Sequence, residues 1–415
     1  MALLIEPIQA ELHLSDTSIS LLIGFAFAMI YAVMGMPLAF VADRWNRVRL
    51  ISIGIAFWSL MTAAGALAKS FGALFTSRMG IGIGEAALSP AVYSILGDLF
   101  PKEKLGRAMS AYAVAVPFGS GLALLFGGLI VSAISHVPYI AIPIVGELAS
   151  WRLVLLCVGL PGLLVALLIR LTIAEPARRG AKGPPATFRW RDAAEVFAYL
   201  RQHWAAFGSV ILGVTLFSGY IFGVIAWVPT MFNRTHGIAP EAGAMPFGAM
   251  YAVFGSAGIL VGGAWGDSLF RRGEAAAHPI VMATGFAIAA VSFTLAPLMP
   301  NPNLAFAMYA PGLFGGMLQT GLMPALFRLM TPSHLRAQTF AFYLLICSVG
   351  GVALAPTEIA LFTDYVFKDQ AALRYSLSVV GALSMFPAAL VIFLGLDAVR
   401  RTVAEQAARE VALSG

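Results

Sequence analysis

Residues 39–49 read Ala-Phe-Val-Ala-Asp-Arg-Trp-Asn-Arg-Val-Arg, and residues 263–272 read Gly-Ala-Trp-Gly-Asp-Ser-Leu-Phe-Arg-Arg. In both stretches a small residue stands four positions before an aspartate, and an arginine stands four positions after it. Each stretch ends a long apolar run, so the pattern recurs in the same orientation at the same end of a hydrophobic segment. The chain therefore contains an internal repeat of two halves.

The chain around these stretches is unusually apolar. Of its 415 residues, 60% are hydrophobic and 11% are charged, whereas a soluble domain carries about 25% charged residues. So little charge cannot cover a water-soluble globule, which excludes a soluble enzyme, a disordered chain and a disulfide-stapled secreted protein. The net charge of +6 is not gathered in one stripe, so no nucleic-acid partner is expected. The composition indicates a polytopic membrane protein whose main partner is the bilayer.

Eleven segments are long and apolar enough to cross a bilayer as helices. A crossing helix needs about 17–25 mainly apolar residues, whereas a barrel strand needs only about ten, of alternating polarity. A Pro-Asn-Pro-Asn turn at 300–303 divides one uncharged run into two segments. We therefore predict an all-α membrane protein. The predicted segments are 17–42, 50–68, 70–97, 108–134, 153–169, 205–233, 242–266, 279–299, 304–327, 337–363 and 375–396.

The positions of lysine and arginine predict the orientation. Twenty of the 26 lie in one set of alternate connections and six on the other side, and connections rich in these residues stay in the cytoplasm. The carboxyl terminus is therefore expected in the cytoplasm, in a bacterial inner membrane. Residues 1–14 contain two glutamates and lack the architecture of a signal peptide. They are expected to be the outer end of a truncated first crossing; a true eleven-helix protein is the alternative.

The longest basic connection divides the segments into five and six. We predict an amino-terminal bundle at 1–170, a cytoplasmic linker at 171–204, a carboxyl-terminal bundle at 205–400 and a cytoplasmic tail at 401–415. Residues 188–204 are amphipathic. They are expected either to lie on the membrane surface or to extend the next crossing.

Ala-Asp43-Arg44-x-Asn46-Arg47 resembles the cytoplasmic signature of the major facilitator superfamily, in the Spinster variant with Asn in place of the second glycine. Residues 78–87, 97–107 and 117–121 support that branch, although Ala39 replaces the first glycine of the signature and Val48 its last basic residue. The resemblance covers essentially the whole chain. It implies two pseudo-symmetric helical bundles that move solutes by alternating access, with the first helix truncated here together with its Asp-Arg pair.

Arg78 and Glu85 are charged residues inside the third predicted segment. Seven residues make two helical turns, so both project from one face about 10 Å apart along the axis. Glu85 falls near the middle of the bilayer, where a charge costs at least about 2.5–3.5 kcal/mol unless it faces a wet cavity or a partner. We predict that Glu85 exchanges a proton and that Arg78 holds either Glu85 or an anionic headgroup. A static ion pair that packs two helices is the alternative.

A second charged group lies at the cytoplasmic face. The family resemblance implies that it latches the two halves when the cavity faces outward. Asp43 is placed to cap a helix of the other half, and Asp98 can pair with Arg44 or Arg47. The alternative is a set of basic loop residues that only satisfy the topology rule. The predicted latch residues are Asp43, Arg44, Arg47, Asp98 and Arg107, with Asp267 and Arg271 as the weaker counterpart in the second half.

Three further residues are candidates for the cavity lining: Glu358, Tyr220 and Gln319. Exposure at the outer end is an equal alternative for Glu358. No pair among the six histidines has metal-ligand spacing, and the two cysteines lie in apolar runs, so neither a metal site nor a disulfide is expected. Since no phosphate-binding loop is present, we expect no cofactor.

These features predict a monomeric secondary transporter of a small amphipathic solute, anionic or lipid-like, coupled to protons. Apart from Arg78, Glu85 and Glu358, the inner thirds of the segments lack charge. A general organic-anion or drug exporter of the same superfamily is the alternative. An integral-membrane lipid-modifying enzyme would need a nucleophile or base group at one membrane face, and none is visible. We therefore do not expect an enzyme.

Overall fold

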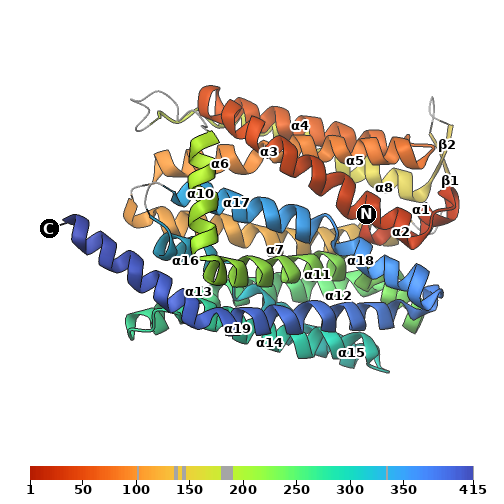
Figure 1. Cartoon of the computed structure of the whole chain (residues 1–415). Helices are drawn as coiled ribbons and strands as arrows, with labels where there is room; N and C mark the ends of the chain where they lie inside the picture. The colour runs from red at the N-terminus through yellow and green to blue at the C-terminus, as the bar shows by residue number, and fades with distance from the viewer. Residues whose placement is uncertain (101, 135–138, 143–145, 179–189, 333–334, 415) are drawn as a thin grey trace.

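The computed structural model describes residues 1–100, 102–134, 139–142, 146–178, 190–332 and 335–414. Its long helices run side by side (Figure 1). Within the described residues, ten helices are long and apolar enough to cross a membrane. A helix satisfies its own backbone hydrogen bonds, which is why apolar segments of this length adopt it in lipid. The prediction of an all-α membrane protein is confirmed.

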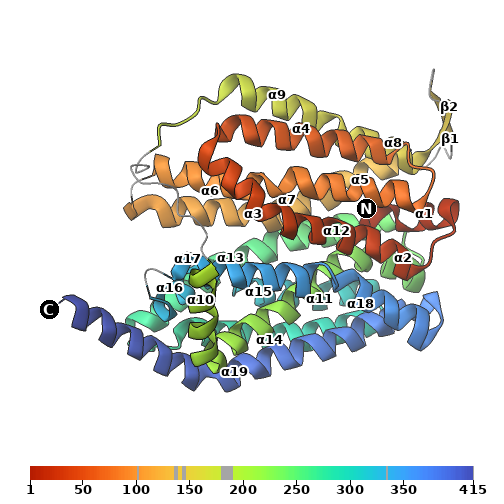
Figure 2. The ribbon, with the colours of Figure 1, turned by 45° about the horizontal axis from the view of Figure 1, so that its top comes forward.

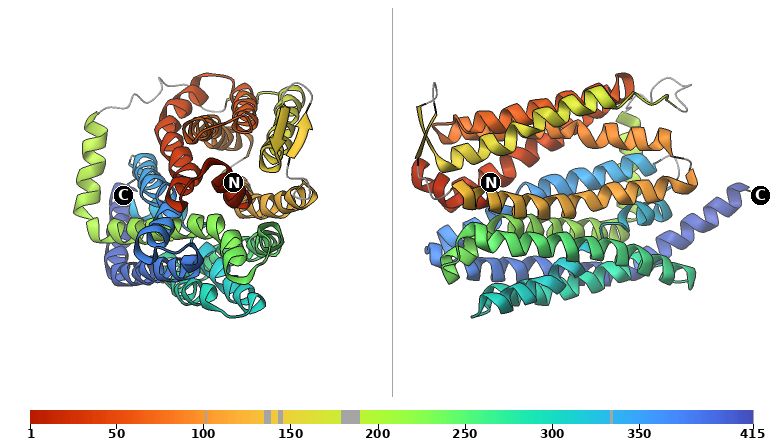
Figure 3. Two further views of the ribbon diagram at one scale, coloured as in Figure 1. Left: turned by 90° about the vertical axis from the view of Figure 1, so that its right-hand side faces the viewer. Right: turned by 180° about the vertical axis from the view of Figure 1, so that it is seen from behind.

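The helices form two groups, one from each half of the chain (Figures 2 and 3). Polar caps start several of them; Asn46 accepts the Arg49 backbone N–H at 2.7 Å and Ser70 accepts that of Ala73 at 3.3 Å. The amino-terminal bundle comprises η1 (Ala2–Leu4), α1 (Ile5–Leu12), α2 (Asp16–Ser20), η2 (Leu21–Phe25), α3 (Ala26–Arg44), α4 (Arg47–Gly65), α5 (Phe71–Ala86), α6 (Leu88–Leu99), α7 (Lys102–Ile134), α8 (Ser150–Gly159) and α9 (Pro161–Thr172).

The carboxyl-terminal bundle repeats this plan. In each bundle the crossing that ends in the repeated aspartate motif carries a short π-helical segment, η2 or η3. The bundle comprises α11 (Trp204–His236), α12 (Pro240–Met250), η3 (Tyr251–Gly255), α13 (Ser256–Arg271), α14 (Ala277–Leu295), η4 (Ala296–Leu298), α15 (Pro302–Met317), α16 (Met323–Met330), α17 (Arg336–Ile346), η5 (Cys347–Val352), α18 (Ala355–Leu361), η6 (Phe362–Phe367), η7 (Gln370–Ala372) and α19 (Leu373–Ser414).

The predicted segment 304–327 is not one continuous helix. It is divided into α15 and α16 by a turn at 318–322, so this one of the eleven predicted crossings is not among the ten helices of membrane-spanning length. Pro324 lies in the first turn of α16, where its missing N–H cannot continue the helix that precedes it. Gly321 in the turn adds conformational freedom.

Two strands were not expected from the sequence. β1 (Tyr139–Ile142) and β2 (Gly146–Ala149) form an antiparallel hairpin between α7 and α8, with Tyr139 opposite Ala149. The hairpin lies at the end of the bundles opposite the arginine-rich connections (Figure 1). We name these two ends the outer end and the basic end, after the predicted orientation.

The connection between the bundles contains α10 (Trp190–Gln202). This helix runs across the direction of the membrane helices (Figures 1 and 3), and the chain turns at His203 into α11. The structure therefore excludes a simple extension of the next crossing, whereas a position on the membrane surface stays a prediction. α19 continues without a break past residue 400, so residues 401–414 are helical. The other domain limits remain predictions.

The two bundles meet closely where α7 crosses α12. A Cβ placed on Gly121 would lie 2.4 Å from the Gly248 carbonyl oxygen, and one placed on Gly248 would lie 2.6 Å from that of Gly121. Backbone cannot retreat from such a contact as a flexible side chain can. Only glycine therefore permits this approach of the two bundles.

We expect Gly121→Ala to lower the thermal unfolding midpoint of the purified protein, because overpacking of this kind costs about 1–3 kcal/mol. Gly119→Ala is the matched control, since a Cβ at Gly119 in the same helix would meet no atom within 4 Å. Its midpoint should stay unchanged or rise. Equal midpoints for both variants would contradict a tight glycine contact.

Candidate functional site

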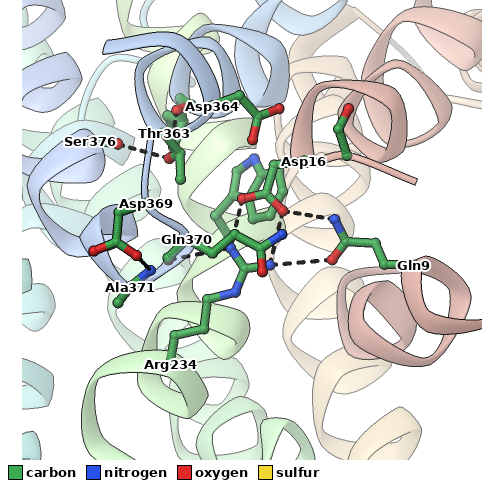
Figure 4. Close-up of polar contacts among 12 residues, drawn as sticks. Gln9, Asp16, Arg234, Thr363, Asp364, Asp369, Gln370, Ala371 and Ser376 are labelled. Carbon is green, nitrogen blue, oxygen red and sulfur yellow. Dashed lines mark hydrogen bonds and ion pairs between the residues drawn. The ribbon is translucent and has the colours of Figure 1, made fainter. Parts of the chain in front are cut away.

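Arg234, in the last turn of α11, joins the two bundles at the outer end (Figure 4). Its Nη1 donates to Asp16 Oδ2 at 2.6 Å and its Nη2 to Asp16 Oδ1 at 2.9 Å, while Nε donates to Glu6 Oε1 at 2.8 Å. Gln9 Nε2 donates to Asp16 Oδ1 at 2.7 Å. The Asp16 side chain is fully buried. This is a two-pronged guanidinium–carboxylate pair, the strongest geometry available to such groups.

Asp364 adds a second contact between the bundles. Its Oδ2 accepts from the Thr17 backbone N–H at 2.8 Å and from the Thr17 hydroxyl at 2.6 Å. One turn further into the membrane, the Ser20 hydroxyl donates to Thr357 Oγ1 at 3.1 Å. We name this set the outer latch: Glu6, Gln9, Asp16, Thr17, Ser20, Arg234, Thr357 and Asp364.

The outer latch joins the two bundles at the outer end. Seven hydrogen bonds between described residues of the two bundles belong to it. Breaking a buried pair by removing one partner costs about 3–5 kcal/mol, because the other charge stays buried. Sequence reasoning missed this latch. Its one visible signal was Arg234, one of few basic residues on the predicted outer side.

Arg47 organises the basic end within the amino-terminal bundle. Its buried guanidinium forms an ion pair with Asp98, as the sequence analysis allowed, and a second with Glu175 Oε1 at 2.7 Å. Nη2 also donates to the Pro176 carbonyl at 2.9 Å, and Glu175 Oε2 accepts the Val48 backbone N–H at 3.0 Å. The stretch after α9 therefore crosses over the start of α4. Sequence analysis did not foresee this role of Glu175.

Three other predicted latch residues, Arg44, Asp267 and Arg271, form no ion pair across the bundles with another described residue. The Arg44 guanidinium stacks on the Phe40 ring, 3.3 Å from its centroid, instead of forming an ion pair with Asp98. Asp267 and Arg271 are exposed and form no ion pair with another described residue. The side chains of Asp43 and Arg107 lie outside the part of the chain that the structure describes. The predicted latch between the two halves thus stays a prediction for another conformation.

Glu85 and Arg78 lie in α5, as predicted on one crossing, but not as a direct ion pair. Arg78 Nε donates to the Leu22 carbonyl at 3.1 Å, and its guanidinium lies 5.9 Å from the Phe27 ring centroid. Glu85 is half-buried, and among the described residues it has no hydrogen-bond or ion-pair partner. The alternative, a static ion pair, is therefore absent between these two described side chains.

The candidates for the cavity lining differ in their surroundings. Tyr220 is fully buried, and its hydroxyl donates to the Leu377 carbonyl at 2.9 Å inside the carboxyl-terminal bundle. The prediction that Tyr220 lines the cavity is wrong, because the ring packs in the bundle core. Gln319 lies in the turn that breaks the ninth segment; its Nε2 donates to Thr320 at 3.2 Å and its buried Oε1 has no partner among the described residues. It remains a candidate.

Glu358 is half-buried in α18 and has no hydrogen-bond or ion-pair partner in the described part of the chain. It shares a helix face with Leu354 and Leu361, whose side chains are 43% and 42% exposed. Thr357, the preceding residue, belongs to the outer latch. Glu358 therefore lies on an exposed face close to the outer end. The described residues contain no group of three or more His, Cys, Asp or Glu that could hold a metal ion.

We expect Arg234→Gln to open the outer end, since it leaves Asp16 buried without a counter-charge. Spin labels at the exposed positions 69 and 303, one on each bundle, should report longer distances by pulsed electron resonance. Arg374→Gln is the control, because that arginine stacks on Tyr375 at the same end. Adding Asp16→Asn to Arg234→Gln removes the buried charge and should restore part of the closed population. Unchanged distances in Arg234→Gln would refute the latch.

The pKa of Glu175 gives a second test. Burial alone would raise it, but the Val48 N–H and the Arg47 guanidinium hold the pKa of this carboxyl below its usual range. Its stabilising contribution is therefore present above about pH 4.3, the usual pKa of glutamate, and is lost as the pH falls through the lower folded value. Thermal midpoints of wild type and Glu175→Gln should differ at neutral pH and converge in acid. A gap that is independent of pH would contradict this.

Comparison with known proteins agrees with this architecture. A family profile described as Major Facilitator Superfamily matches residues 1–356. An MFS-type efflux pump of Mycolicibacterium smegmatis is 26% identical over 98% of this chain and 90% of the pump. The sphingosine-1-phosphate transporter SPNS2 of Danio rerio is 27% identical over 69% of this chain, which spans 56% of that protein.

A solved structure shares the fold along nearly the whole chain. The crystal structure of a bacterial homologue of the human lysosomal transporter Spinster, in an inward-facing and unoccupied conformation, matches with a TM-score of 0.75 and 27% identity. The match covers 98% of this chain and 93% of that one. The resemblance noted from the sequence is confirmed. The chain belongs to the major facilitator superfamily, is a multi-pass membrane transporter, and is similar to Spinster proteins.

Proposed function

We propose that this transporter is proton-coupled and carries a small amphipathic solute with an anionic, lipid-like headgroup. The observation that supports this most is Glu85: a half-buried carboxylate in a membrane helix, without a hydrogen-bond or ion-pair partner among the described residues. A charge in such a position is costly, and acidic residues inside membranes mark ion and proton pathways. Glu85 can lower that cost by binding a proton.

Arg78 supplies the complementary charge. One of its five N–H donors is used by the Leu22 carbonyl, which leaves the other side of the guanidinium for a ligand. A guanidinium binds carboxylate and phosphate groups through paired hydrogen bonds. When an anionic headgroup occupies Arg78, the electrostatic support that Arg78 gives to charged Glu85 weakens, so proton uptake and substrate binding become linked.

Alternating access requires the outer end and the basic end to open in turn. The outer latch is closed in this conformation, so substrate and protons reach Glu85 from the basic end. We propose that the opposite conformation breaks the Arg234–Asp16 pair and joins the predicted latch residues of the basic end to Asp267 and Arg271. In this scheme the basic end is cytoplasmic, the membrane is a bacterial inner membrane, and one monomer carries out the cycle.

The relatives support this substrate class without fixing it. By its name, SPNS2 transports sphingosine-1-phosphate, an amphipathic anion. The pump of Mycolicibacterium smegmatis is an efflux pump, which keeps a general organic-anion or drug exporter as the second candidate. Uptake of lysophospholipids into vesicles, with competition by small organic anions, separates the two. No enzymatic activity is proposed.

We expect Glu85→Gln to abolish the dependence of transport on a pH gradient, because glutamine cannot release a proton. Uptake of radiolabelled lysophosphatidic acid into proteoliposomes should respond to an imposed gradient in wild type and not in the variant. Glu241→Gln, which alters a carboxylate near the start of α12, is the matched control and should behave as wild type. Gradient-driven uptake that persists in Glu85→Gln would exclude Glu85 as the coupling group.

A further inference from the structure

The linker helix α10 is fastened to the carboxyl-terminal bundle by buried polar side chains. The Tyr199 hydroxyl donates at 2.6 Å to the carbonyl of Met330, where α16 ends, and it accepts from Gln406 Nε2 of α19 at 2.7 Å. His203 follows at the corner between α10 and α11, and its ring centroid lies 4.6 Å from that of Tyr199. The side chains of Tyr199, His203 and Gln406 are buried. They therefore connect α10 to the ends of two membrane helices.

The part of α19 beyond residue 400 supplies the docking surface for α10. Thr402 and Gln406 are four residues apart, so they lie on one face of the helix, and both are buried. Thr402 Oγ1 lies 3.4 Å from His203 Nδ1. A helix end that extended freely into solvent would bury neither side chain. We name Tyr199, His203, Thr402 and Gln406 the strap contact.

The strap contact favours a neutral His203 ring. Because the Thr402 hydroxyl donates to the Ala398 carbonyl at 2.9 Å, its oxygen is the acceptor for His203 Nδ1. The hydrogen-bond network thus assigns the ring proton to Nδ1. Nε2 is buried and has no hydrogen-bond partner among the described residues. A second proton would go to Nε2 and create a buried donor without an acceptor, which costs free energy.

The charged groups around His203 do not offset this cost. Glu405 Oε2 lies 3.8 Å from Nδ1 and attracts a charged ring, but the Glu405 side chain is 52% exposed, so water screens the attraction. Arg409 of the same helix repels a charged ring. Burial raises the pKa of Tyr199, the titratable neighbour on α10, to about 12, so this residue stays neutral. Burial, supported by Arg409 and opposed by Glu405, holds the pKa of His203 below its usual value.

We propose that His203 makes α10 a pH-sensitive strap, which is docked on the carboxyl-terminal bundle while the ring is neutral and is released when the ring takes up a second proton. In the released form the new N–H reaches water and finds an acceptor. Because the pKa is lower in the docked form, docking is fully favoured above about pH 6.5, the ordinary value of histidine, and is lost as the pH falls through the docked value. The strap responds to the compartment at the basic end.

Release of the strap changes the link between the two bundles. On its amino-terminal side the linker is tied to the other bundle, because Glu175 pairs with Arg47 and Arg178 Nη2 donates to the Ala42 carbonyl at 2.8 Å. With α10 docked, the linker is thus fixed on both bundles. With α10 released, the fixed point on the carboxyl-terminal side moves to the start of α11, and the free part of the linker becomes longer. Acid at the basic end therefore loosens the connection between the bundles.

Spin labels at positions 197 and 394 measure the docking by pulsed electron resonance, in the full chain with Cys157→Ser. Both positions are exposed, one on α10 and one on α19. We expect a narrow distance distribution at about pH 7.5 and a broader, longer one at about pH 5.5, on either side of the ordinary pKa of histidine. His203→Asn keeps a donor near the Nδ1 position but cannot gain a proton, so its distribution should stay narrow at both pH values.

Two further variants make the test specific. His13→Asn removes an exposed histidine at the outer end and should keep the acid response of the wild type. Glu405→Gln removes the attraction for the charged ring in the docked form, so α10 should be released at a higher pH than in the wild type. An unchanged wild-type distribution at pH 5.5, or an acid response that persists in His203→Asn, would overturn the strap. If His203→Asn is released at both pH values, Glu405→Gln decides alone, and a release pH that does not rise refutes the proposal.

Discussion

The Arg234–Asp16 pair is the contact on which the conformation of this transporter depends. It joins the end of α11 to the start of α2 across the two bundles, with both side chains shielded from solvent. When one charge of a buried pair is removed, the other stays buried without a counter-charge, which is costly. The closed pair is therefore strongly favoured over a broken one. While this pair is made, the two bundles are joined at the outer end. In the proposed cycle Glu85 is then reached from the basic end, and rupture of the pair is the step that opens the outer end.

A rigid contact accompanies this breakable one. Gly121 and Gly248 bring α7 and α12 together backbone to backbone, which holds the two bundles in close contact at this point. Arg47 meanwhile ties Asp98 and Glu175 into its own bundle, so the basic end of that bundle moves as a unit. The ion pairs of Arg47 hold parts of one bundle together. The Arg234–Asp16 pair joins the two bundles, and in the proposed cycle it is the contact that breaks and reforms.

The sequence predicted the features that depend on local pattern. Apolar length predicted the crossings, and the repeated aspartate motif predicted the two halves and the charged cluster in which Arg47 meets Asp98. It could not predict contacts between distant segments, such as Arg234 with Asp16 or Glu175 with Arg47, because hydrophobicity carries no information about which charges become neighbours. The expectation that Tyr220 lines the cavity failed for the same reason. The hydroxyl of a tyrosine in a crossing can face either a backbone carbonyl or a cavity, and the sequence does not tell which. The break at 318–322 was signalled by Gly321 and Pro324 but hidden in an apolar run.

The polar groups inside the membrane fall into two kinds: those with hydrogen-bond partners, which stabilise the fold, and those without, which are candidates for a role in transport. Tyr220 donates to backbone carbonyls and Trp227 to the Pro356 carbonyl at 2.9 Å; these bonds are short and closed, and they hold the bundle together. Glu85 has no such partner among the described residues. Folding alone would favour an apolar side chain at this position. The cost of Glu85 to the folded state is accounted for if this carboxylate binds a proton during transport.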